Sequence, residues 1–348
     1  MIQNIIIIGD THFGVRNNSM VWLKHQRDGF MEIIKYMEES IKIYDETIVI
    51  HVGDLFDSRS SINPLIYKTV EDLMRTIDLI MGNSQKKSHM YIIGGNHDYY
   101  YQWESENNYS ATLMLPEFDN ITYVNKYAEE CTGGIIMIPW FLFHNPISLE
   151  EIIKDKNPAK NIIFTHTDPI NIDPEIQKLI YGYPLITGHI HQPMIDRENS
   201  ILITGASYPI DFADTNSERG FWTMTREFNQ ADIYTEVSGM GIINFHPIKS
   251  SIHFFTITEQ MLPDWGKLGI KKDDYVEIQI RVNRIDDYKD ILKELNDNFN
   301  INIIYLIETN NLITEQTEIL DVDSVCRKLL PERLKHIYKQ MVESCKSI

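Results

Sequence analysis

The chain has 348 residues, which is enough for one large α/β domain or two domains of ordinary size. Hydrophobic residues make up 43% and aromatic residues 11% of it, so a disordered, collagen-like or disulfide-scaffold protein is excluded. The formal net charge is −18 at pH 7, which opposes non-specific adhesion to nucleic acid or to an anionic membrane surface. An enzyme that acts on nucleic acid is not excluded, because bound cations and local Lys or Arg side chains can offset the negative electrostatic field at a site.

Cysteine usage and hydropathy predict a cytoplasmic protein. Cys131, Cys326 and Cys345 form no C-x-x-C pair and leave one cysteine unmatched, which is typical of a reducing compartment. The longest apolar runs, such as 5–8 and 135–138, are far shorter than the roughly 20 residues of a membrane-spanning helix. No basic segment followed by a long apolar stretch opens the chain, so neither a secretory signal nor a membrane partner is expected.

Strands and helices alternate in the first third of the chain. Continuous β-branched runs at 2–9, 47–52 and 89–94 predict buried strands, and the first two lead into Gly-Asp. Ser61-Ile62-Asn63-Pro64 offers an N-cap and a first-turn proline for a helix. Apolar residues follow the spacing of one helical face in two stretches, at Phe30, Ile33, Ile34, Met37 and Ile41, and at Ile66, Val70, Leu73, Ile77 and Met81.

The pattern becomes rich in strands in the middle of the chain. Alternating strands and helices followed by many strands predict the α/β fold class, as a sandwich of two sheets flanked by helices. The expected strands cover 121–124, 134–138, 161–165, 184–187, 200–204, 220–225 and 232–237.

The chain changes character after Gly239-Met240-Gly241. Strands expected at 253–258, 275–282 and 301–307, with a helix at 287–298, predict a small α+β unit. Polar residues then indicate a linker, which leads to a helical tail at 321–346. The apolar residues of this tail either pack on the chain's own body or dock on a partner. The predicted domains are 1–240, 241–311 and 312–348.

Five short motifs each follow a predicted strand. In α/β sheets, ligands gather at the carboxyl ends of strands, where loops from different elements converge. The glycine that opens four of the motifs lets the backbone turn sharply and leaves room for a ligand. Their Asp, Asn and His side chains are ligands that suit Mn²⁺, Fe²⁺, Ni²⁺ or Zn²⁺. The motifs are Gly9-Asp10-Thr11-His12, Gly53-Asp54-Leu55-Phe56-Asp57, Gly94-Gly95-Asn96-His97-Asp98, Thr165-His166-Thr167 and Gly188-His189-Ile190-His191.

The spacing inside the motifs favours metal binding over unrelated turns. Asp10 and His12 are two residues apart, so at a strand end both side chains point the same way and can hold one ion. His189 and His191 share this spacing and could serve one ion each. Two cations about 3.5–4 Å apart can clamp the attacking and the leaving oxygen of a phosphoryl displacement, without a side-chain nucleophile. The chain contains neither a G-x-S-x-G elbow nor a G-x-x-x-x-G-K-[ST] loop, so serine-hydrolase and P-loop chemistry are not expected.

Taken together, the motifs resemble those of the calcineurin-like metallophosphoesterases. G-D-L-F-D followed by a helix, G-N-H-D, G-H-I-H and the later Arg219-Gly220-Phe221 are similar to the SbcD/Mre-type DNA repair nucleases. In length and motif context, the recombination endonuclease subunits of bacteriophages are the nearest members of that family. The resemblance covers residues 1–240 with specific motifs, and the C-terminal parts by domain order alone.

The resemblance implies a role for each matching residue. Asp10, His12, Asp54 and His191 match the ligands of one metal, and Asp54, Asn96, His166 and His189 match those of a second. Asp54 would thus bridge the two ions, and His97 matches the catalytic histidine beside the scissile phosphate. Asp57 stands where many members have a histidine and is not counted as catalytic, and Gly205-Ala206-Ser207 stands where they often have Gly-Ser.

The resemblance also implies a function and its partners. The chain would be a DNA exonuclease or endonuclease in recombination, replication and double-strand-break repair, with two divalent cations, Mn²⁺ in the first place and Mg²⁺ as the alternative. Its partners would be DNA, an SbcC-type coiled-coil ATPase that receives the tail helices at 321–330 and 331–346, and a second copy of the chain. Residues 241–311 would cap the DNA, and the location would be the cytoplasm, that of the host for a phage protein.

Two other functions stay open. The charge of −18 favours a metallophosphoesterase for a small substrate, such as a cyclic nucleotide or a phosphomonoester. A metal-binding scaffold without catalysis is the non-enzymatic alternative, against which the complete ligand set argues. Tyr99-Tyr100-Tyr101 with Trp103 either stacks on bases or lies on a half-buried surface, whereas His51 and His89 are expected to be packed histidines. Asp98 is expected to orient its loop.

Overall fold

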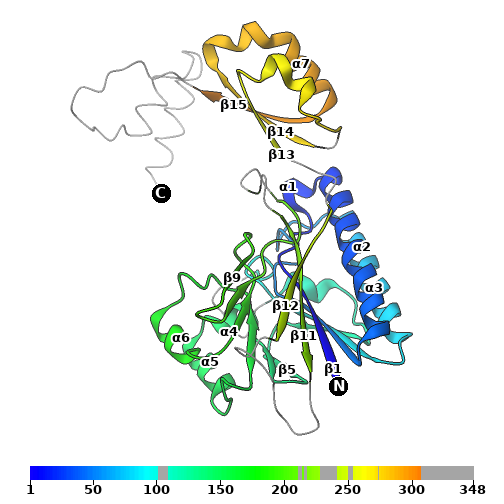
Figure 1. Ribbon diagram of the computed structural model, residues 1–348, viewed down its shortest axis with the longest axis vertical. Coiled ribbons are helices and arrows are strands. Elements are labelled where there is room, and N and C mark those ends of the chain that lie inside the picture. The colour runs from blue at the N-terminus through cyan, green and yellow to red at the C-terminus, as the bar shows by residue number, and fades with distance from the viewer. Residues whose placement is uncertain are drawn as a thin grey trace, which may run out of the picture. The chain divides into compact units, whose positions relative to one another are not determined.

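The computed structural model describes residues 1–100, 109–210, 214, 218–227, 241–249, 254–272 and 274–306 (Figure 1). Two six-stranded mixed sheets pack face to face and form its larger part. The first sheet has the strand order β12-β11-β1-β2-β3-β4. Its strands are β1 (Ile2–Ile8), β2 (Glu46–His51), β3 (Lys87–Ile93), β4 (Ile121–Val124), β11 (Gly220–Glu227) and β12 (Ile242–Pro247).

The second sheet has the strand order β5-β6-β7-β8-β10-β9. Its strands are β5 (Glu129–Cys131), β6 (Ile135–Met137), β7 (Ile162–Thr165), β8 (Leu185–Thr187), β9 (Met194–Asp196) and β10 (Ile201–Ile203). In each sheet the central strands are parallel: β1 to β4 in the first, and β6, β7, β8 and β10 in the second. The loops that follow parallel strands leave the sheet at one edge, which is where the predicted motifs begin.

The residues of β1 alternate between two hydrophobic cores. Ile5 and Ile7 pack between the sheets, against residues such as Phe164 of the second sheet. Ile6 and Ile8 face the opposite way and pack under the helices. All four side chains are at most 1% exposed, and burial of such a side chain stabilises the fold by roughly 1.5–3 kcal/mol. The isoleucine run is thus the expected sequence of a strand covered on both faces.

Helices cover the outer face of each sheet. The α-helices are α1 (Val15–Asn18), α2 (Met20–Ile43), α3 (Pro64–Gly82), α4 (Trp140–Phe143), α5 (Pro146–Ile153), α6 (Pro174–Leu179) and α7 (Lys289–Asn298), and the 3-10 helices are η1 (Ala111–Met114), η4 (Leu262–Lys267) and η5 (Val282–Tyr288). Figure 1 shows α2 and α3, in blue, beside the first sheet and α4, α5 and α6, in green, beside the second. Among the described helices, none is both long and apolar enough to cross a membrane.

A third, three-stranded sheet follows in the order β13-β14-β15. Its strands are β13 (Phe254–Thr258), β14 (Tyr275–Arg281) and β15 (Asn300–Leu306), and α7 packs on them through Leu292 and Leu295. This small α+β unit has a hydrophobic core of its own. It also contacts α2, because the Trp22 ring stacks on Tyr275 with 5.3 Å between the ring centroids.

The predicted fold class, a two-sheet α/β sandwich flanked by helices with a small α+β unit, is confirmed. The first sheet extends beyond residue 240, where the domain was predicted to end. Its last strand, β12, runs from Ile242 to Pro247 and pairs antiparallel with β11. The strand expected at 232–237 and the tail at 321–346 lie outside the described residues. The three domain ranges stay predictions.

Candidate metal centre

The five motifs meet at the carboxyl edge of the two facing sheets. Asp10 follows β1, Asp54 follows β2 and Asn96 follows β3, all in the first sheet. His166 and His189 follow β7 and β8 in the second sheet. Backbone hydrogen bonds pair the first two loops, since the amides of residues 11 and 12 both donate to the carbonyl of Asp54, at 3.2 and 3.0 Å.

One group of donor atoms comes from Asp10, His12 and His191. Their donor atoms all lie within 4.8 Å of one another. Nε2 of His12 is 3.1 Å from Nε2 of His191, which in turn is 3.7 Å from a carboxylate oxygen of Asp10. Asp10 and His12 are buried, whereas the His191 side chain is 35% exposed. The arrangement brings a carboxylate and two imidazoles close together, with His191 as the most exposed of the three.

A second group comes from Asn96, His166 and His189. The side-chain oxygen of Asn96 lies 2.9 Å from Nε2 of His166 and 2.9 Å from Nδ1 of His189. His166 is fully buried, and its other ring nitrogen is 2.9 Å from the carbonyl oxygen of Val52. A carbonyl oxygen can only accept, so the proton of a neutral His166 ring sits on Nδ1 and leaves Nε2 free as a ligand.

Asp54 lies between the two groups. Its Oδ2 atom is 3.6 Å from Nε2 of His12 and 3.2 Å from Nε2 of His166. Its Oδ1 atom accepts the backbone amide of His97 at 2.9 Å. One carboxylate oxygen therefore faces both groups of donors, while the other is fixed by the loop after β3.

His97 is also close to this centre. A ring nitrogen of His97 and donor atoms of His12 and Asp54 lie within 4.8 Å of one another, and the His97 side chain is exposed to solvent. Nδ1 of His97 is 2.7 Å from the main-chain carbonyl oxygen of Asp57. The residue predicted as catalytic is thus within reach of a ligand bound at the centre.

Three of these residues adopt a left-handed backbone conformation, which residues other than glycine rarely adopt. The φ angles of His12, Asp54 and His189 are +41°, +53° and +77°. A residue other than glycine in this conformation destabilises the fold by about 1–3 kcal/mol, and backbone strain of this kind is common at functional sites. Its concentration in three predicted ligands indicates that the fold holds these side chains in place against local preference.

The motif glycines make room for the site residues themselves. A Cβ atom at Gly95 would lie 2.2 Å from Oδ1 of Asp54, and one at Gly53 would lie 2.4 Å from the His166 ring. Gly53 also has a φ of +112°, in the region that favours glycine. The room predicted for a bulky ligand is therefore occupied here by the side chains of Asp54 and His166.

The carboxylates and histidines of the site shift one another's pKa values. Burial would raise the pKa of Asp54, but His166, His12 and His97 hold the pKa of that carboxyl far below its usual range. Burial would lower the pKa of His166, but Asp54 and Asp10 raise it to about 9. Burial lowers the pKa of His189 and of His191. The Asp54 carboxylate thus stays ionised and attracts positive charge, while the imidazoles of His189 and His191 stay neutral, as ligands of a cation must.

Residues around the centre fix the loops that carry it. Asp98 is fully buried and accepts the backbone amides of Gly95, Leu55 and Phe56, which joins two motif loops, as expected. Gln26 of α2 donates its amide to the carbonyl oxygens of residues 11 and 12, at 2.9 and 2.7 Å. Gln26 was not among the residues predicted for the site, although a polar residue on the apolar face of a helix, between Leu23 and Phe30, is a usable signal.

Several other motif residues have structural contacts. Arg219 is buried, pairs with Asp214 and donates to Gln192, so Arg219 stabilises the loop before β11. Ala206 forms a bridge to Asp10, and its amide donates to the carbonyl of His191 at 2.9 Å. The segment 205–207 is thus a wall of the site.

The aromatic segment after the third motif is only partly described. Tyr99 is buried, donates its hydroxyl to the Asn125 carbonyl and therefore cannot stack on a base. Tyr100 is 54% exposed, and residues 101–108 lie outside the described residues. His51 is buried against Thr11, with the pKa lowered to about 3 by burial, as expected for a packed histidine.

The fold and the site define a class of protein. Residues 3–193, more than half of the chain, match the calcineurin-like phosphoesterase family, and the chain belongs to this family. It is also similar to the DNA double-strand break repair protein Mre11 of Nanoarchaeum equitans (strain Kin4-M). The identity is 24% over 375 residues, which cover 94% of this chain and 91% of that protein. The predicted resemblance to the calcineurin-like metallophosphoesterases and to the SbcD/Mre-type nucleases is thereby confirmed, whereas the nearness to the bacteriophage members stays a prediction.

Proposed function

We propose that the chain is the nuclease subunit of an SbcCD-like complex for recombination and double-strand-break repair, and that it hydrolyses DNA phosphodiesters with two divalent cations. The observation that carries this proposal is the position of Asp54, whose Oδ2 atom faces donor groups on both sides, at 3.2 and 3.6 Å. The similarity to Mre11 over nearly the whole chain supports the DNA substrate.

The proposed ligand sets share Asp54. Asp10, His12, Asp54 and His191 would hold one cation, and Asp54, Asn96, His166 and His189 the other. A set that mixes carboxylate and amide oxygens with imidazole nitrogens suits several divalent cations. Mn²⁺ is the proposed ion, with Mg²⁺ as the alternative, because the resemblance to the family implies it. Cations held there supply Lewis-acid stabilisation of the charge that develops on the phosphoryl oxygens.

His97 is the proposed catalytic residue. Its Nδ1 atom donates to the Asp57 carbonyl, so Nε2 is available to a phosphate oxygen or to the leaving oxygen. A neutral ring would accept a proton through Nε2, and a protonated ring would donate one to the leaving group. Asp57 has the role of orienting the ring through its main chain, so no second catalytic histidine is needed at that position.

The further partners follow from the same proposal. Residues 312–348 would bind the coiled coil of an SbcC-type ATPase, since the chain contains no nucleotide-binding loop. The small α+β unit would cap DNA, a second copy of the chain would form a homodimer, and the complex would work in the cytoplasm, that of the host if the chain is encoded by a phage. A partner protein that contributes Lys and Arg side chains would also offset the charge of −18 and increase the affinity for DNA.

A small-substrate metallophosphoesterase is the second candidate, and the acidic charge favours it. One experiment separates the candidates: purified protein is incubated with Mn²⁺ or with EDTA, against linear duplex DNA and against bis-p-nitrophenyl phosphate. The proposal expects Mn²⁺-dependent hydrolysis of both substrates, and no hydrolysis by Asp54→Ala. Hydrolysis of bis-p-nitrophenyl phosphate alone would favour a small substrate, and hydrolysis of neither would indicate a scaffold.

A further inference from the structure

A pocket of about 540 Å³ opens beside the second donor group. Asn96 and His189 form one of its walls, and the remaining walls come from α4, the start of α5, the loop after β7 and α6. The residues that determine the chemistry of these walls are Trp140, Phe141, Asn145, Asp168, Asn171 and Asp173. The pocket therefore begins at two proposed metal ligands and leads away from them.

The aromatic wall of the pocket is fixed to the metal centre. The backbone amide of Trp140 donates to the carbonyl of Gly94 at 3.0 Å, which ties α4 to the loop that carries Asn96. The next residue, Phe141, packs edge-on against Tyr99, with 5.2 Å between the ring centroids. Trp140 is half-buried, so part of its indole stays accessible from the pocket.

Away from Asn96 and His189, the lining of the pocket is unfavourable for a phosphate and fits a base. Asp168 and Asp173 are carboxylates, and no Lys or Arg is among the described residues that line the pocket. A phosphate would meet repulsion there, whereas a neutral aromatic ring can stack on Trp140. Asn145 accepts the Ser148 amide through Oδ1 at 3.1 Å, so its NH₂ group is the part that can donate to a base. Asn171 donates to Asp168 at 2.6 Å, so its side-chain oxygen is the part that can accept, and the carboxylates can accept further hydrogen bonds from exocyclic amino groups. The volume also lies in the range of about 300–1,000 Å³ that is typical of small-ligand pockets.

We propose that this pocket binds the nucleobase next to the scissile phosphate and that Trp140 is the surface on which that base stacks. The inference rests on the proposed function and adds a substrate contact to it. Binding of the base would place the phosphodiester beside Asn96 and His189, because these residues line the same pocket. Trp140 would then contribute to the specificity of the enzyme for nucleotides over other phosphodiesters.

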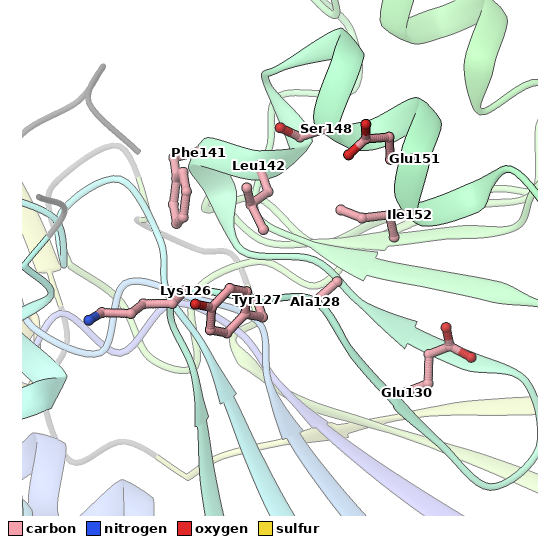
Figure 2. A pocket seen from close by; sticks show the side chains of 9 residues that line it. All are labelled: Lys126, Tyr127, Ala128, Glu130, Phe141, Leu142, Ser148, Glu151 and Ile152. Atoms are coloured by element: carbon pink, nitrogen blue, oxygen red, sulfur yellow. The ribbon is translucent and has the colours of Figure 1, made fainter. Parts of the chain in front are cut away.

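A neighbouring hollow supplies a matched control. Figure 2 shows Phe141 and Leu142 of α4 and Ser148, Glu151 and Ile152 of α5 above Lys126, Tyr127 and Ala128. This hollow of about 670 Å³ shares Phe141 with the base pocket but contains none of the proposed metal ligands. Tyr127 is 76% exposed, so Tyr127→Ala removes an aromatic ring near α4 without touching the proposed base site.

The test compares oligonucleotides that carry a single abasic residue at successive positions around the cleaved bond. The full-length protein with Mn²⁺ is assayed for kcat/KM as wild type, Trp140→Ala, Trp140→Phe and Tyr127→Ala. Loss of a stacked base is expected to lower kcat/KM of the wild type roughly 5- to 150-fold at one position. Trp140→Ala should discriminate far less between the intact and abasic oligonucleotides at that position, whereas Trp140→Phe should restore part of the discrimination and Tyr127→Ala should keep all of it.

The outcomes separate this inference from the proposed function. If DNA is cleaved but Trp140→Ala discriminates as the wild type does, the base site is wrong and the nuclease proposal stands. If no oligonucleotide is cleaved while bis-p-nitrophenyl phosphate is hydrolysed, the nuclease proposal itself fails. The p-nitrophenyl ester of thymidine monophosphate then tests the same pocket for a free nucleotide.

Discussion

Nδ1 of His97 lies 2.7 Å from the main-chain carbonyl oxygen of Asp57. The carboxylate of the same Asp57 lies 3.5 Å from Nδ1 of His12. One residue of the G-D-L-F-D motif thus contacts two histidines of the site, one through its main chain and one through its side chain. The contact with His97 needs no particular side chain at position 57, because it is made by the main-chain carbonyl oxygen.

The first prediction concerns His97 as an acid or base. A group of this kind typically contributes about 10²–10⁴-fold to the rate. We expect His97→Ala to lower kcat on that scale, while elemental analysis finds full metal occupancy and DNA affinity is unchanged. Loss of a metal would instead make His97 a ligand together with His12 and Asp54, whose donor atoms lie within 4.8 Å of its ring. Unchanged turnover would leave it a structural role.

The second prediction concerns the shared carboxylate. Because Oδ2 of Asp54 faces both donor groups, Asp54→Ala should release both cations and abolish hydrolysis. His12→Ala should weaken mainly the site formed with Asp10 and His191. Metal content after gel filtration and the circular dichroism spectrum are the measurements. Two tightly bound ions in folded Asp54→Ala would contradict the assignment.

The third prediction concerns protons and metal affinity. Without a cation, burial would lower the pKa of His166, but the neighbouring carboxylates raise it to about 9, so its ring is protonated at pH 7. A cation binds only the neutral ring, so binding at pH 7 should release a proton, and affinity should rise with pH up to about 9. Calorimetric titration of Mn²⁺ in two buffers of different ionisation enthalpy measures this release. An enthalpy of binding that is the same in both buffers would contradict the predicted proton release.

Much of the fold and the site could be predicted from the sequence because their signals are local. Isoleucine runs mark strands that are covered on both faces, and the motifs at the strand ends identify the residues of the site. The orientation of His12 and His189 could not be predicted from strand alternation, because both residues have positive φ angles. Asn63 caps α3 through the amide of Leu65, as its position before Pro64 predicts.

Other contacts could not be predicted because they arise only when distant segments meet. Arg219 is buried because it pairs with Asp214 and donates to Gln192. Gln26 donates from the buried face of α2 to a loop that precedes the helix, and its partner there could not be predicted from the sequence. The helix α4 has four residues, which is too short for a periodic sequence pattern. The pocket lined by Trp140 therefore could not be predicted from the local sequence.

The fourth prediction concerns the stability of the joined loops. Asp98 accepts three backbone amides with its two carboxylate oxygens, and it is fully buried. In Asp98→Asn an amide group replaces one of these oxygens and leaves a buried backbone donor unpaired. The free energy of unfolding should fall by about 1–3 kcal/mol in urea titrations with EDTA present. The exposed Asp155→Asn should stay within about 0.5 kcal/mol of the wild type, and equal stability of the two variants would refute the assigned role.

The fifth prediction concerns the C-terminal residues. Truncation after Asn311 keeps β15, which ends at Leu306, and removes the apolar residues at helical spacing that the sequence predicts between 321 and 346. Because the donor groups and the small α+β core all lie before Leu306, we expect the truncated protein to fold and to keep Mn²⁺-dependent cleavage of short or single-stranded DNA. It should no longer bind an SbcC-type ATPase or show ATP-stimulated digestion of long duplex, because helices of this kind dock their apolar face in a groove of a partner. Co-elution with the ATPase on gel filtration and a thermal melt are the measurements. A truncated protein that still co-elutes, or one that unfolds because the tail belongs to its own core, would contradict the proposal.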